Sequence, residues 1–518
     1  MKKIQYILIA AICALALSSC EKFLDVNPRT KVSEAEYFSN EEEMMRGFYN
    51  LLWEVKHRLL EIHDYSSYLS DESETGGGLG EGSYKYKWDN FTYSPSNCFG
   101  EYGYGSWWNE WDYGIFNAVI AANILADKLE ACTLPESFVK PLLAETKFFR
   151  ALVYNYLWMS YEEIPLIKGI LKAEDMYTVE KGSRQAVFDY MMEDLSDENI
   201  ALLPPRSAVV QGRICADAAK VLRAKIILFH RSEKDYEKAL NDMKGIITSK
   251  TYSLDPDFKH LWLKDGEWGP ENIYNISAST VNNEGMGFVH GLGGRNISDP
   301  RSAEQGGLLN GYGQCTVSSY IYNMFEEGDT RREGSVIVYA DEMEKVAKLV
   351  ADGELPEGSV FTVSEEQENY EGFGHFKYTP RKENTGSVSP ENNHGNPFRF
   401  YRYADVLLLG TELAVRTNKL DSQSQDWFDQ IRDRAFGDTK HRISLTGMSQ
   451  KAALDVLFKE RFYEFYDEMQ RWFDILRFDK GTEILGSKGW TEKFRYFPID
   501  QTEIDRSQGG LTQNPGWL

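Results

Sequence analysis

Small and apolar residues recur every three or four positions in three parts of the chain, and each part predicts a helix followed by a second helix. The first starts at Leu142 and its motif extends to Tyr156, the second covers Ala216 to Met243, and the third covers Tyr403 to Ala435. Alanine at the contact positions lets helices approach closely, which is typical of tetratricopeptide-like helix pairs. Because the repeats are unevenly spaced, the pattern indicates a mostly α fold with a helical scaffold rather than a regular solenoid.

One longer helix is predicted from Ala452 to Phe478, because its apolar residues keep a single stripe with a period of 3.6 residues. Between the helices lie three long stretches, 64–106, 255–315 and 355–398, rich in Gly, Asn, Ser and aromatic residues. Loops of this length are usually functional or disordered, and their aromatic content argues against disorder. We therefore expect the helices to form the scaffold and the loops to carry the chemistry.

The N-terminus predicts an export signal. Lys2 and Lys3 precede an apolar run from Ile4 to Leu17 that only Gln5 interrupts, and this run is shorter than the roughly twenty residues that span a bilayer. The run ends in Leu17-Ser18-Ser19-Cys20, which resembles the bacterial lipobox. Residues 1–19 are therefore predicted to be a lipoprotein signal peptide, and acyl chains on Cys20 to anchor the mature chain to a membrane.

Composition excludes some classes of protein. The chain has 518 residues and a formal net charge of −23, which argues against nucleic acid as a partner because binding it needs a basic face. Aromatic residues make up 14%, with 12 Trp and 30 Tyr, and ring faces that are not buried suit the apolar faces of sugars. Cys98, Cys132, Cys215 and Cys315, which remain after the signal peptide and the anchor, lack disulfide or zinc-ligand spacing and are predicted to be small buried residues.

Several motifs follow one another in an order that carries a family resemblance. They are Cys20-Glu21-Lys22-Phe23-Leu24-Asp25, Ala144-Glu145-Thr146-Lys147-Phe148-Phe149-Arg150-Ala151, Arg402-Tyr403-Ala404-Asp405-Val406-Leu407-Leu408, Glu460-Arg461-Phe462-Tyr463-Glu464-Phe465 with Glu468, Arg471-Trp472-Phe473-Asp474-Ile475 with Arg477, and the closing Phe497-Pro498-Ile499-Asp500 and Asn514-Pro515-Gly516-Trp517. In these motifs the chain resembles the SusD/RagB family. It departs from the family at Met469, where Gly is frequent, and at Asp500, where Pro is frequent.

The resemblance implies a surface lipoprotein of the cell outer membrane in Bacteroidota. It implies one SusD-like domain over 20–518, with a ligand-loop part to about residue 320 and a C-terminal RagB/SusD part from about 321, on four tetratricopeptide-like helix pairs. Family members bind a nutrient, usually an oligosaccharide, and act as a lid over a SusC-like TonB-dependent transporter. The resemblance implies neither catalytic residues nor a cofactor.

Aromatic residues are concentrated between Tyr84 and Tyr113, where twelve occur in thirty residues. Tyr84, Tyr86 and Trp88 alternate with lysines, which suits an extended strand whose same-side residues lie about 6.7 Å apart and could stack on consecutive sugar rings. Any single aromatic residue here could instead belong to a hydrophobic cluster under a loop. Tyr102 lies in the same cluster and is a further candidate contact.

Helical phase separates the tryptophans that follow. Trp108, Trp111, Ile115, Val119 and Ala122 would share one buried stripe, whereas Trp107 lies about 100° away and is predicted to be exposed. Trp107 and Trp88 are therefore the predicted sugar platforms, and Trp111 is predicted to be structural.

Polar candidates lie in the same loops. Asp71 precedes Gly76-Gly77-Gly78, and its carboxylate could accept hydrogen bonds from sugar hydroxyls or simply lie in a solvated turn. Arg295 and Tyr312, in the second loop, combine a long donor with a stacking ring. Arg295 would also suit an acidic sugar or a peptide carboxylate, which leaves the ligand class open.

No nucleophile elbow, P-loop, zinc-protease motif or dinucleotide fingerprint is present, and His57 and His63 do not share a helical face. We therefore expect a non-enzymatic, glycan-binding lipoprotein without a metal site. A peptide-binding member of the same family is one alternative. A helical-barrel glycoside hydrolase is the other, and it requires two carboxylates about 5–10 Å apart that nothing in the sequence marks.

Overall fold

The computed structural model describes residues 38–78, 83–98, 114–172, 179–281, 289–385, 393–507 and 509–517. Helices dominate this part of the chain: α4 (Glu41–Leu69), α5 (Ser83–Asp89), α6 (Phe116–Ala131), α7 (Glu136–Tyr161), α8 (Arg184–Asp194), α9 (Asp197–Ile200), α10 (Ala216–His230), α11 (Tyr236–Ser249), α12 (Val289–Leu292), α13 (Ser319–Met324), α14 (Tyr339–Ala351), α15 (Tyr403–Arg416), α16 (Ser422–Phe436), α17 (Gln450–Phe465), α18 (Arg471–Arg477), α19 (Gly481–Leu485) and α20 (Gln501–Arg506).

The strands in these ranges are short and pair antiparallel, two by two. The pairs are β1 (Glu74–Thr75) with β5 (Cys315–Thr316), β2 (Ile164–Pro165) with β3 (Lys181–Gly182), β4 (Asn272–Ile276) with β8 (Phe398–Arg402), and β6 (Val336–Val338) with β7 (Phe373–His375). Because most of these strands have only two or three residues, they tie loops together and do not form a sheet that could serve as a core layer.

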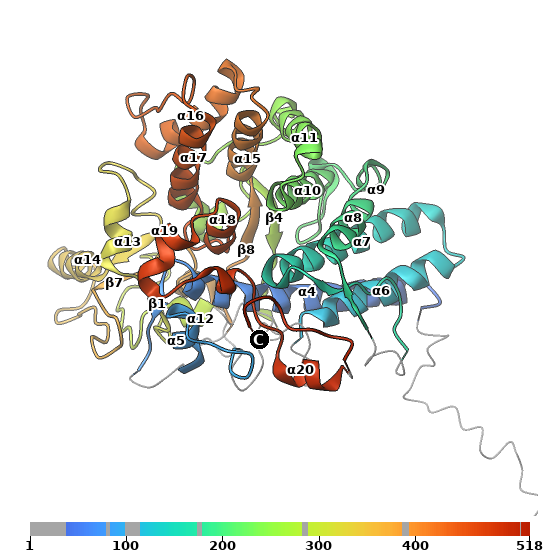
Figure 1. The fold of residues 1–518 in the computed structure, drawn as a ribbon. Coiled ribbons are helices and arrows are strands. Elements are labelled where there is room, and N and C mark those ends of the chain that lie inside the picture. Colours follow the sequence, from blue (N-terminus) through green and yellow to red (C-terminus); the bar gives the residue numbers. More distant parts are fainter. Residues whose placement is uncertain are drawn as a thin grey trace, which may run out of the picture.

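The predicted helix pairs are present. Helix α7 packs against α8, α10 against α11, and α15 against α16, and α10 contacts α7 while α11 contacts α15, so the pairs adjoin (Figure 1). Small residues make the close contacts, as expected. Ala219 and Ala239 are fully buried, and an added Cβ on Gly410 of α15 would lie 3.2 Å from the Trp427 ring of α16. The mostly α fold with a helical scaffold is therefore confirmed.

Helix α4 connects this scaffold to the loop segments. Its first turn is capped by Asn40, whose Oδ1 accepts a hydrogen bond from the Glu43 N–H at 3.0 Å, and its buried side packs against α6, α7 and α18. In Figure 1 it crosses the molecule between the scaffold helices and the region that holds α5, α12 and β1. The buried stripe predicted to start at Trp108 and Trp111, which lie outside the described ranges, is confirmed for its later members Ile115, Val119 and Ala122, all of them buried.

The single helix predicted over Ala452–Phe478 is wrong, because the helix is interrupted between α17 and α18. Asp467 and Met469 adopt positive φ angles of 60° and 59°, which no continuing helix allows. The break turns the Asp467 side chain toward His63 and His375, 3.3 Å from each, and the Glu468 side chain toward Lys377. Periodicity missed it because the apolar stripe resumes in phase after the break.

Motif residues of the C-terminal part form a buried network of ion pairs. Arg402, at the end of β8, contacts Glu468 through two hydrogen bonds of 2.8 and 2.9 Å and Glu464 through one of 3.0 Å. Arg434 and Arg331 also contact Glu464. Burial alone would raise the pKa of Glu464, but these three guanidiniums hold it below its usual value. The charged residues of these motifs therefore stabilise the interior of the scaffold.

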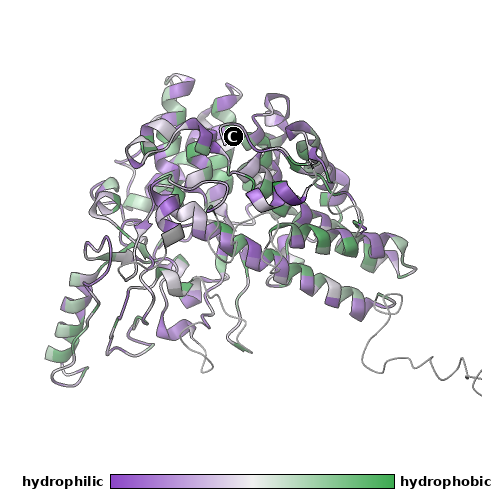
Figure 2. Ribbon diagram, turned by 60° about the horizontal axis from the view of Figure 1, so that its bottom comes forward, coloured by the Kyte–Doolittle hydropathy of each residue, from purple (hydrophilic) through white to green (hydrophobic). Residues whose placement is uncertain are grey.

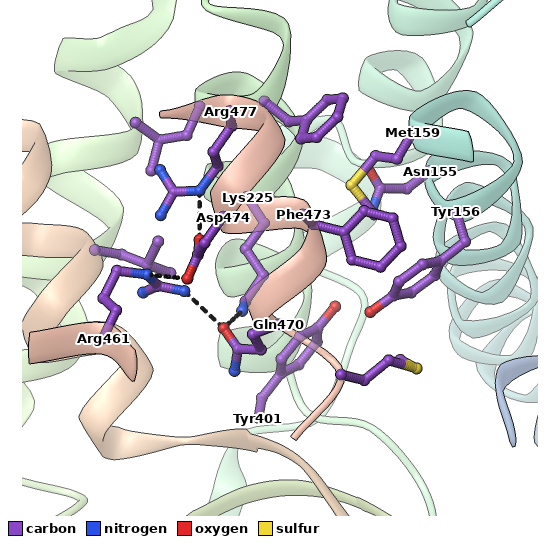
Figure 3. Close-up of a pocket in the computed structure, with 14 residues that line it drawn as sticks. Asn155, Tyr156, Met159, Lys225, Tyr401, Arg461, Gln470, Phe473, Asp474 and Arg477 are labelled. Carbon is purple, nitrogen blue, oxygen red and sulfur yellow. Dashed lines mark hydrogen bonds and ion pairs between the residues drawn. The ribbon is translucent and has the colours of Figure 1, made fainter. Parts of the chain in front are cut away.

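A small cavity lies beside a second group of polar contacts, formed by Lys225, Arg461, Gln470, Asp474 and Arg477 (Figure 3). Asp474 accepts hydrogen bonds of 2.7 Å from both Arg461 and Arg477, and Gln470 Oε1 accepts from Lys225 and Arg461. Burial lowers the pKa of Lys225. The cavity measures about 50 Å³, room for a few water molecules and far below the roughly 300–1,000 Å³ of ordinary ligand sites. We therefore assign it to the scaffold and not to a ligand site.

Hydrophilic and hydrophobic residues alternate along the helices (Figure 2). Within the described ranges, no helix combines the length and the hydropathy that crossing a membrane requires. The four described cysteines are unpaired, and Cys98, Cys215 and Cys315 are buried as predicted, whereas Cys132 is half-buried.

Candidate ligand-binding site

Loops from distant parts of the chain meet beyond the C-terminal end of α4. Strand β1 pairs with β5, the Gly76 N–H donates to the Gln314 carbonyl at 2.8 Å, and the Glu368 N–H donates to the Gly77 carbonyl at 3.0 Å. We call the surface built by residues 70–78, α5, 289–296, 311–316 and 362–371 the loop face. Its elements α5, α12 and β1 lie together in Figure 1.

Glycines bring two loop segments of this face into direct contact. The Gly311 N–H donates to the Gly294 carbonyl at 2.9 Å, and the Gly313 N–H donates to the Gly293 carbonyl at 2.8 Å. A Cβ on Gly311 would lie 2.3 Å from the Gly293 oxygen, so only glycine fits there. This close approach fixes the backbone on either side of the residue between the two glycines, Tyr312.

Arg295 and Tyr312, predicted from the sequence as ligand contacts, lie side by side on this frame. Arg295 Nη1 donates to the Tyr312 carbonyl at 3.5 Å, and the Arg295 carbonyl accepts from the Ser364 N–H at 2.9 Å. The Tyr312 side chain is 45% exposed and Arg295 is half-buried. An accessible ring thus adjoins a planar guanidinium, a combination that can stack on a sugar and donate to its hydroxyls.

Three further residues support this pair and were not singled out in the sequence analysis: Lys85, Gln314 and Gln367. Lys85 donates to Asp64 at 3.2 Å and to Gln314 Oε1 at 3.0 Å, which ties α5 to the segment after Tyr312. Gln367 donates from Nε2 to the Ser364 carbonyl at 2.8 Å, while its Oε1 is a buried acceptor without a hydrogen bond among the described residues. No local signal could have found the Lys85 contacts, because Asp64 and Gln314 are distant from it in sequence.

The predicted strand over Tyr84, Tyr86 and Trp88 is wrong, since these residues lie on helix α5. Trp88 is fully buried, donates from Nε1 to the Cys98 carbonyl at 2.7 Å, and packs its ring against Tyr65 and Tyr68. It therefore presents no ring face to a ligand at the surface. Lys85, one turn before it, and Asp89 are buried as well, so the inward positions of α5 follow helical spacing and not the alternation seen in the sequence. Tyr86 is half-buried.

Asp71 is neither a free acceptor nor part of a solvated turn. It is buried and accepts two hydrogen bonds, of 2.7 and 2.8 Å, from Arg471. Its neighbour Glu72 is buried as well and accepts from the Asp467 N–H at 3.0 Å; burial and the Asp467 charge raise the pKa of Glu72. These carboxylates therefore hold the loop face onto α18 and the turn before it.

Other predicted residues lie outside the described ranges: Cys20, Tyr102, Trp107, Trp108 and Trp111. Their roles stay predictions, as does that of Tyr84, of which only the place in α5 is described. Among the described residues, no cluster of three or more His, Cys, Asp or Glu side chains is arranged to hold a metal ion.

Comparisons with known proteins identify similar chains. The model of the SusD family matches residues 314–492. SusD-like protein P25 of Formosa agariphila is 21% identical over 496 residues, which cover 92% of this chain and 90% of P25. SusD-like protein P2 of the same organism is 22% identical over 403 residues, 74% of this chain and 75% of P2.

Solved structures have the same fold. Surface glycan-binding protein A from Bacteroides fluxus is 23% identical and matches with a TM-score of 0.76 over 92% of this chain and all of its own. Surface glycan-binding protein A from Bacteroides thetaiotaomicron, solved in complex with laminarihexaose, is 22% identical and has a TM-score of 0.75 over 91% of this chain and 99% of its own. The predicted resemblance to the SusD/RagB family is confirmed.

Proposed function

We propose that this chain, which is SusD-like in sequence and fold, is a non-catalytic lipoprotein that binds oligosaccharides at the loop face. In this proposal it delivers them to a SusC-like TonB-dependent transporter, and a lipid on Cys20 anchors it to the outer membrane at the cell surface. The observation that carries the binding role is the pairing of the exposed Tyr312 ring with Arg295 on a frame of glycines. The glycan-binding names of similar solved structures support the ligand class.

The loop face suits capture and release better than catalysis. Asp71 and Glu72 face the interior, and Asp64 accepts from Lys85, so these carboxylates do not form the opposed pair that a glycosidase needs. A preformed ring and a few donors would give moderate affinity without a large ordering cost. A ligand bound in this way can be passed on.

Replacing Tyr312 or Arg295 with alanine should each weaken oligosaccharide binding about tenfold, because the first removes the stacking face and the second the donors. Calorimetric titration against a panel of oligosaccharides that includes laminarihexaose and against peptides would measure this. Tyr312→Phe keeps the ring and should bind nearly as well as the wild-type protein.

Unchanged affinity in both alanine variants would contradict the assignment of the loop face. The same samples analysed for cleavage products would test the non-catalytic role, because shorter sugars would indicate a hydrolase. Binding of peptides alone would keep the face but replace the ligand class.

Gly313→Ala should also weaken oligosaccharide binding, although residue 313 is not one of the proposed ligand contacts. Gly313 has a φ of 61°, and an added Cβ would lie 2.3 Å from Gln367 Oε1 and 2.9 Å from the Arg295 Cβ. The chain must therefore shift where Arg295 and Tyr312 meet. Gly306→Ala is the matched control, since Gly306 also has a positive φ, of 74°, but has no atom within 4 Å of an added Cβ. Equal affinities of the two variants would show that the Arg295–Tyr312 frame is not needed.

A further inference from the structure

A second hollow lies along the N-terminal half of α4. Its volume is about 390 Å³, within the range of small-molecule sites. One wall is formed by α4, and the other by the end of β4 and the chain that follows it. The residues that line it are Tyr49, Leu52, Trp53, Val55, Lys56, Gly212, Tyr274, Ile276, Ser277, Ala278 and Ser279.

Two aromatic side chains of α4 are accessible here. Tyr49 is 57% exposed and Trp53, one turn later, is 44% exposed, so two large rings on one side of α4 face the same hollow. His57 packs against the Trp53 indole with ring centroids 4.0 Å apart, and its Nδ1 donates to the Trp53 carbonyl at 2.7 Å. Burial lowers the pKa of His57, which disfavours a positive charge beside the groove.

The opposite wall combines apolar side chains with two exposed serines. Ser277 and Ser279 place hydroxyl groups along it, and a Cβ on Gly212 would lie 2.6 Å from the Ser277 oxygen. Among the described residues of this lining, Lys56 is the charged one and no carboxylate is present. Ring faces opposite hydroxyl groups, with little charge, match a neutral ligand that has CH-rich faces and hydroxyls of its own.

We propose that this α4 groove is a second binding site for a neutral sugar chain, separate from the loop face. Fifteen residues of α4 separate Trp53 from Tyr68, whose hydroxyl donates to the Gln314 carbonyl at the loop face, so the two sites lie about 22 Å apart along the helix. The inference rests on the proposed glycan-binding function for its ligand class, and it adds a site that can hold the polymer while the loop face holds a chain end.

Calorimetric titration with laminarihexaose, maltohexaose and mannohexaose tests the groove. The wild-type protein should bind a hexasaccharide at two sites. Trp53→Ala should lose one of them, at least tenfold in affinity, while Tyr312→Ala should lose the other. Trp53→Phe should retain both, and Met448→Ala, which truncates an exposed side chain elsewhere, should match the wild-type protein.

A single site that Tyr312→Ala removes and Trp53→Ala leaves unchanged would overturn the groove while the proposed function stands. Absence of binding by the wild-type protein to any saccharide would overturn both. Light scattering on the same samples separates another occupant: a wild-type dimer that Trp53→Ala dissociates would show that the groove holds a second copy, and the sugar assignment would then be wrong.

Discussion

Arg402→Ala is expected to lower the free energy of unfolding by about 3–5 kcal/mol, because it removes a buried cation that compensates three buried carboxylates at once. Arg402 is 1% exposed and contacts Glu468 and Glu464 directly, and Glu271 as well. Denaturant unfolding followed by circular dichroism measures the change. Arg46→Ala is the matched control: Arg46 forms an ion pair with Glu42 at 2.7 Å on the surface, and its loss should cost less than about 1 kcal/mol.

The pH dependence of this variant gives a second readout. In the wild-type protein the pKa of Glu464 is lowered, so the stability that it contributes is present above its unfolded pKa of about 4.5 and is lost as the pH falls through its lower folded value. Without Arg402 the pKa of the buried carboxylates rises. The stability difference between Arg402→Ala and the wild-type protein should therefore be full at neutral pH and shrink as the pH falls through the folded pKa of Glu464 in the variant. Equal unfolding midpoints and equal pH profiles for the two proteins would contradict the role of the network.

Trp88→Ala is expected to cost about 3–5 kcal/mol of stability, as truncation of a buried tryptophan commonly does. The ring is fully enclosed, and the variant also leaves the Cys98 carbonyl without its indole donor. Thermal unfolding measures the loss. Trp53→Ala, on the exposed part of α4, is the control and should change stability little.

Trp88→Phe separates a structural role from a binding role. It keeps most of the packing and should bind oligosaccharides with wild-type affinity, in contrast to Tyr312→Ala. If Trp88→Phe lost binding while its stability stayed near that of the wild-type protein, Trp88 would be a ligand contact despite its burial.

The helical scaffold could be predicted from the sequence because its signals are local. The residues of one helix face recur every three or four positions, as in the stretch that became α15, and small residues such as Gly410 mark where the next helix packs. The family motifs were equally visible. The structure shows why those charged residues belong together: Arg402, Glu464 and Glu468 meet in one buried network.

The site could be predicted only in part. Arg295 and Tyr312 are predicted contacts because their side chains suit a saccharide, but nothing in the sequence indicated that glycine contacts bring them together. Trp88 and Asp71 have side chains just as suitable, and both turn inward. Their direction depends on partners far along the chain, the Cys98 carbonyl and Arg471.

The sequence by itself determined which segments are helical, which residues form their buried faces, and which family the motifs resemble, because periodicity and motif order are properties of neighbouring residues. Tertiary structure alone decided where α17 ends, which aromatic rings remain accessible, and which polar groups share a surface. Accessibility and ion pairing depend on distances between segments hundreds of residues apart, as with Asp71 and Arg471, and local sequence does not contain those distances.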